Sequence, residues 1–133
     1  MTNAQKICEY LEECGVFYIA TIDGIWPRVR PETIVCVCGG VVHFLFGRGD
    51  DIYGQLLMND RAAIAATHPD KSTILIEAKL REDNGEEPRQ EMMKHCEESL
   101  DEIRKEGTLT VFRVASARAV ITQVDGKTEE IIL

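Results

Sequence analysis

The hydrophobic and polar positions at the start of the chain follow a helical period. Apolar residues recur every three or four positions between residues 7 and 14. Thr2 or Asn3 precedes them as a helix cap, and Gly15 follows as a residue type that commonly ends helices. The pattern therefore predicts a first helix that ends at Gly15.

The pattern then changes to short extended runs that are rich in β-branched and aromatic residues. The first three runs are 16–22, 28–38 and 41–46. Asp23-Gly24 separates the first two, and Gly39-Gly40 separates the second from the third, and both pairs are strong turn signals. We therefore predict three antiparallel strands in succession.

The second half of the chain repeats this alternation of helical and extended patterns. After the turn 47–50, Asp50 or Asp51 caps a short helix that closes at Asn59-Asp60. Strands are predicted at 62–67 and 72–80, a polar loop at 82–88, a helix through Met92, Cys96, Leu100 and Ile103, and strands at 108–114, 117–123 and 128–133.

These elements predict a mainly β fold, a barrel with flanking helices at its rims. Tight hairpins favour antiparallel pairing, and the strands outnumber the helices. The 133 residues are enough for one hydrophobic core and too few for two ordinary domains. We therefore predict a single domain that spans residues 1–133.

Composition excludes several functional classes. The formal net charge of −8 disfavours binding to nucleic acid and to anionic membranes. No apolar run approaches the roughly 20 residues of a transmembrane helix, and residues 1–6 do not resemble a signal peptide. A cytoplasmic protein is expected.

The five cysteines suggest reduced thiols more than a disulfide framework. Cys36 and Cys38 lie two positions apart on a predicted strand, so their side chains share a face and could begin a metal site. His43, His68 and His95 do not add a recognisable zinc spacing. We therefore interpret these cysteines as small apolar core residues and predict no metal.

Two segments resemble a known family. The run 17–24, followed by Pro27-Arg28-Val29-Arg30-Pro31, is similar to the opening hairpin of the pyridoxamine 5'-phosphate oxidase-like, FMN-binding split-barrel proteins. The strand 42–46, the polar turn 47–51 and the short helix 52–59 follow in the order found in that family. The final strands from residue 109 also look like its C-terminal pattern, so the resemblance covers nearly the whole chain.

The resemblance implies a six-stranded antiparallel split barrel that forms a homodimer, with two FMN sites in the interface. Arg30 matches the arginine of the phosphate site because it stands three residues after Pro27. The cofactor-binding residues implied in this way are Arg28, Val29, Arg30, Pro31, Phe46, Gly47, Arg48, Gly49, Asp50 and Gln55.

The chain departs from the family at two of these positions. Asp50 aligns with a lysine of the phosphate turn, and Phe46 aligns with a hydroxyl residue just before it. A carboxylate near a phosphate repels it, so Asp50 is expected to weaken FMN binding. Arg48 and the backbone amides near Gly47 and Gly49 offer replacement donors.

Two functions of different class follow. The first is an FMN-dependent oxidoreductase that passes electrons between a nicotinamide or similar donor and a small acceptor. The second is a non-catalytic split-barrel protein that has lost FMN and binds another ligand, such as haem, or a protein partner. The segment 28–31 favours the first, whereas Phe46 and Asp50 favour the second. Trp26 fits either a ligand-stacking role or a dimer contact.

Overall fold

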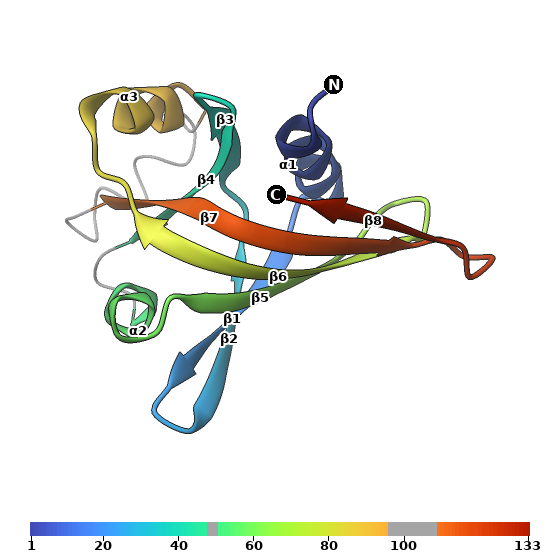
Figure 1. Cartoon of the computed structure of the whole chain (residues 1–133), viewed down its shortest axis with the longest axis horizontal. Coiled ribbons are helices and arrows are strands. Elements are labelled where there is room, and N and C mark those ends of the chain that lie inside the picture. The colour runs from blue at the N-terminus through green and yellow to red at the C-terminus, as the bar shows by residue number, and fades with distance from the viewer. Residues whose placement is uncertain (48–50, 96–108) are drawn as a thin grey trace.

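The computed structural model describes residues 1–47, 51–95 and 109–133. Their secondary structure is mainly extended (Figure 1). In chain order the elements are α1 (Asn3–Cys14), β1 (Phe17–Asp23), β2 (Trp26–Glu32), β3 (Val35–Cys38), β4 (Val41–Gly47), α2 (Ile52–Met58), β5 (Arg61–Thr67), β6 (Thr73–Glu82), α3 (Glu86–His95), β7 (Leu109–Thr122) and β8 (Thr128–Ile132).

The strands form one antiparallel sheet that closes on itself. Its order is β2-β1-β5-β6-β7-β4-β3, and β8 pairs with β7 beside this path. β2 and β3 lie at opposite edges of the order, yet only Thr33 and Ile34 separate them in the chain. Because so short a connection joins both edges, the sheet must curl round into a barrel, as predicted.

Three predicted elements are corrected. The run 28–38 is two strands that lie at opposite edges of the sheet, so β4 pairs with β7 and β3 and not with β2. The strands predicted at 108–114 and 117–123 are one strand, β7, with Ala115 as an unpaired extra residue between Val114 and Ser116. The described residues contain eight strands, the number that the sequence pattern predicts, whereas the resemblance implies six.

The third helix begins earlier than the sequence pattern indicates. α3 starts at Glu86, inside the predicted loop 82–88. Pro88 is its third residue, where a missing N–H breaks no helical hydrogen bond. The predicted helix positions Cys96, Leu100 and Ile103 lie outside the described residues.

The barrel interior is an aromatic and aliphatic core. Phe17, Phe44, Phe46 and Phe112 are fully buried, and the ring of Phe46 contacts both Phe44 and Phe112, with centroids 6.1 and 5.8 Å apart. α1 and α2 add Ile7, Leu11, Ile52 and Leu56 to the same cluster. The side chains of β5 and β6 alternate between buried and more exposed positions, so the sheet has a defined inner and outer face.

Polar contacts fix α1 to the turn between β5 and β6. The hydroxyl of Tyr10 lies 2.7 Å from Ser72 Oγ, and its ring lies 4.9 Å from that of His68. The carboxylate of Glu13 accepts a hydrogen bond from His68, and this bond raises the pKa of the imidazole. No helix in the described ranges is long and apolar enough to cross a membrane; the cytoplasmic location stays a prediction.

Candidate functional site

The pairing of β1 with β2 decides which way the predicted site residues face. Arg30 lies opposite Ile19 and Arg28 lies opposite Thr21, and both partners are buried. Directly opposite residues share a face, so both arginines project toward the inner side of the hairpin. Val29 lies between them and projects to the outer face.

Arg30 is held by two buried polar side chains, and these three residues are called the Arg30 cluster. Arg30 Nη1 donates to Thr21 Oγ1 at 3.0 Å, and Nη2 donates to Gln55 Oε1 at 2.9 Å. The Thr21 hydroxyl also donates to Gln55 Oε1 at 2.5 Å. Thr21 is 1% exposed and Gln55 is 8% exposed. The cluster therefore fixes one guanidinium where β1, β2 and α2 meet.

Arg28 is tethered far less firmly. Its Nε lies 3.4 Å from Asp23 Oδ2, and about half of each side chain is exposed. Exposed pairs of this kind contribute about 0–1 kcal/mol, so Arg28 can exchange Asp23 for a stronger acceptor at little cost. Pro31 is exposed and projects to the outer face with Val29, because it lies opposite the exposed Tyr18.

The remaining predicted residues divide between the core and the undescribed turn. The Phe46 side chain is only 2% exposed and packs in the barrel core, which leaves its backbone as the part that can face a ligand. Gly47 ends β4, half-buried, opposite Leu109. Arg48, Gly49 and Asp50 lie outside the described residues.

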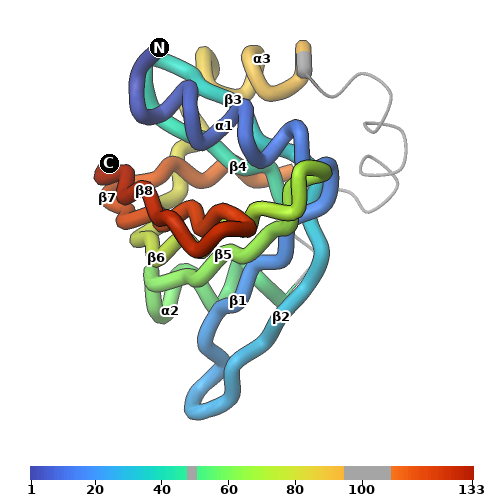
Figure 2. Tube along the Cα trace, turned by 90° about the vertical axis from the view of Figure 1, so that its right-hand side faces the viewer, coloured from blue at the N-terminus to red at the C-terminus, as the bar shows by residue number. Residues whose placement is uncertain are grey.

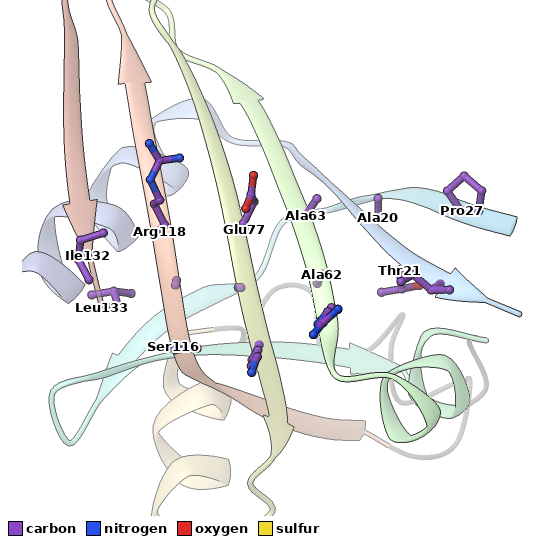
Figure 3. Close-up of a pocket in the computed structure, with 15 residues that line it drawn as sticks. Ala20, Thr21, Pro27, Ala62, Ala63, Glu77, Ser116, Arg118, Ile132 and Leu133 are labelled. Atoms are coloured by element: carbon purple, nitrogen blue, oxygen red, sulfur yellow. The ribbon is translucent and has the colours of Figure 1, made fainter. Parts of the chain in front are cut away.

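A groove of about 650 Å³ runs across the outer face of the sheet (Figure 3). One row of directly opposite residues crosses it: Ala20, Ala63, Glu77, Arg118 and Ile132. Ala20 and Ala63 form a small apolar floor on this face, called the alanine floor, whereas Ala62, Ala78 and Ala117 also border the groove but have side chains buried on the inner face. Thr21 belongs to both the groove lining and the Arg30 cluster, which therefore adjoin.

The thiols and His43 lie in a separate packed region. Cys36 is 1% exposed, and its Sγ contacts Met92 Sδ. Burial raises the pKa of the Cys38 thiol. His43 is buried, with Nε2 3.0 Å from Asp83 Oδ2 and Nδ1 2.8 Å from Val41 O. Within the described ranges, no three His, Cys, Asp or Glu residues gather in a way that could hold a metal ion.

Comparison with solved structures settles the fold. The chain superposes on a NimC/NimA family protein from Clostridium acetobutylicum with a TM-score of 0.88 at 21% identity, covering 98% of this chain and 92% of that one. It also superposes on a pyridoxamine 5'-phosphate oxidase-related, FMN-binding protein from Nostoc punctiforme with a TM-score of 0.60 at 9% identity, covering 98% and 93%. The chain has the pyridoxamine 5'-phosphate oxidase-like split-barrel fold.

The same split-barrel fold occurs in proteins with other ligands. The haem storage protein HutZ from Vibrio cholerae superposes with a TM-score of 0.63 at 15% identity, covering 86% of this chain and 89% of that one. No family model and no curated protein sequence matches the chain. Likeness at these identities shows the split-barrel fold alone and does not identify a ligand of this chain.

Proposed function

We propose that this split-barrel protein binds FMN non-covalently and uses it in electron transfer between a nicotinamide or similar donor and a small acceptor. The observation that carries the proposal is the Arg30 cluster, which adjoins an alanine-floored groove at Thr21. A guanidinium suits a phosphate because it binds two oxygens at once, and a flat apolar floor suits an aromatic ring system. The donor set therefore fits FMN.

Each residue has a defined part in this proposal. Arg30 would bind the phosphate, with Thr21 and Gln55 fixing the direction of its fork, and Arg28 would leave Asp23 to join it. Val29 and Pro31 would line the cofactor from the outer face, and the alanines would exclude water beneath the ring. Bound FMN supplies the redox chemistry, for which these side chains provide only binding and orientation.

The proposal includes a homodimer. Ile25 is 91% exposed, Trp26 67%, Val29 69% and Leu75 63%, although all four are large apolar residues. Ile25 and Trp26 lie at the turn of the β1–β2 hairpin, which projects from the rest of the molecule (Figures 1 and 2). A second copy of the chain would cover these surfaces and complete the site.

The homodimer is tested by light scattering on the purified protein at micromolar concentration. We expect twice the chain mass of 14.9 kDa. The expectation follows because burial of these apolar side chains in a symmetric interface removes them from water. A stable monomer would remove the shared-site model and leave each groove to act alone.

FMN binding is tested with Arg30→Gln. A charged hydrogen bond to phosphate contributes about 1.5–3 kcal/mol, so we expect FMN to bind roughly tenfold to a hundredfold more weakly, as measured by quenching of flavin fluorescence. Lys127→Gln is the matched control, since it removes one charge from an exposed turn. Equal weakening in both variants, or no quenching by wild-type protein, would remove the proposal.

Haem is the second candidate, because a haem storage protein shares the fold. The groove argues against it, because the described residues that line it include no His, Cys, Met or Tyr, the side chains that usually hold haem iron. Absorption spectra after separate addition of FMN and haemin distinguish the two. A shifted Soret band together with unquenched FMN would support haem in place of flavin.

A further inference from the structure

Two cations lie directly opposite each other on the outer face of the sheet. Arg61 on β5 pairs with Lys79 on β6 in the antiparallel ladder, and both side chains are exposed. The Cβ atoms of directly opposite residues are about 4.5–5.5 Å apart, and like charges at such positions destabilise a sheet. A negatively charged group close to both side chains would therefore stabilise this arrangement.

The described part of the chain does not supply that counter-charge. No described carboxylate lies within 4 Å of either cation, and the nearby acids are engaged elsewhere: Asp60 pairs with Arg81 at 3.7 Å, and Glu130 pairs with Arg118 at 2.7 Å. Glu77 stands in the next row, opposite Ala63 and Arg118, and forms no ion pair with Lys79. Two positive charges thus remain side by side in a chain of net charge −8.

The position of this pair also points to a ligand. Arg61 and Lys79 both line the groove, together with Ser116, which lies opposite Lys79 in the same row. Figure 3 shows Ser116 and Arg118 on β7, across β6 from Ala63 on β5. The bulge at Ala115 immediately follows this row, and bulges are common where a strand re-aims side chains at a site.

We propose that Arg61 and Lys79 bind the anionic group, a phosphate or a carboxylate, of a small ligand whose planar body lies on the alanine floor. The hydroxyl of Ser116 adds a neutral donor to the same row. This site is separate from the Arg30 cluster, whose arginine projects to the inner side of the β1–β2 hairpin. The flavin ring proposed above would occupy the same alanine floor, so the two ligands would compete there, but binding of an anion by Arg61 and Lys79 is measured without flavin and can fail while flavin binding stands.

Four small probes test the site at constant ionic strength. Phenyl phosphate and benzoate carry a planar ring with an anion, and phenol and benzamide are their neutral counterparts. Dissociation constants are measured from chemical-shift changes of backbone amides in the labelled protein. We expect one of the two anions to bind at least about tenfold more weakly to Arg61→Gln/Lys79→Gln, with no change for the neutral probes. The anion that responds distinguishes a phosphate from a carboxylate ligand.

Two single variants, Lys127→Gln and Arg30→Gln, serve as controls for the double variant. Lys127→Gln should bind the probes like wild type, whereas equal losses would show a general charge effect and overturn the proposal. Loss of anion binding in Arg30→Gln alone would assign the anion to the Arg30 cluster and also overturn it. If the double variant keeps its anion affinity but changes the mass seen by light scattering, the cations pair with acids of a second copy, and the anion site is rejected.

Discussion

Replacement of Phe46 by alanine is expected to lower the free energy of unfolding by about 3–5 kcal/mol. The ring is 2% exposed and lies between Phe44 and Phe112 in the barrel core, so its removal leaves a cavity that these neighbours cannot fill without repacking. Phe46→Leu keeps most of the volume and should cost less. The largest stability effect is thus expected at a residue that the sequence resemblance placed in the cofactor site.

Denaturant unfolding at one fixed protein concentration measures this effect, because the stability of a dimer depends on concentration. FMN affinity of the folded variant is measured on the same sample. A loss of core packing should lower stability and leave the affinity of the remaining folded protein nearly unchanged. If Phe46→Ala instead lost less than about 1 kcal/mol while FMN binding fell sharply, the side chain would belong to the ligand site and not to the core.

Local patterns predict much of this fold because they depend on neighbouring residues. The first helix and the hairpin at Asp23-Gly24 follow from periodicity and turn chemistry, and both are confirmed. The break at Thr33-Ile34 is different, since both residues are good strand formers and only barrel closure separates β2 from β3. The sequence pattern predicts two strands in place of β7, because the extra residue Ala115 reverses the alternation of faces along the strand.

In the candidate site too, features that depend on one strand could be predicted from the sequence, and contacts between elements could not. Alternation along one strand correctly places Arg28 and Arg30 on a common face. The hydrogen bond between Arg30 and Thr21 could not be predicted from the sequence, because it depends on the pairing of β1 with β2 and on the docking of α2. Arg61 and Lys79 are eighteen positions apart in the sequence, and they lie opposite each other only because of the register in which β5 pairs with β6. The sequence pattern does not predict that register.

Asp50→Lys is expected to tighten FMN binding by about tenfold to a hundredfold. The resemblance aligns Asp50 with a lysine of the phosphate turn, so the substitution removes a negative charge and adds a positive one near the same phosphate. After solvent screening, the two changes together are worth about 1–3 kcal/mol. Fluorescence titration of FMN into both proteins measures the gain.

Riboflavin separates a phosphate effect from every other cause. It carries the same ring without the phosphate, so its affinity should change little in Asp50→Lys. The gain for FMN should also shrink at higher ionic strength, because mobile ions screen the attraction between a lysine and the phosphate. A general change in surface charge or in folding would alter both flavins alike. Equal changes for the two flavins, or none for FMN, would mean that Asp50 does not face the phosphate and that the alignment of this turn with the family's phosphate turn is wrong.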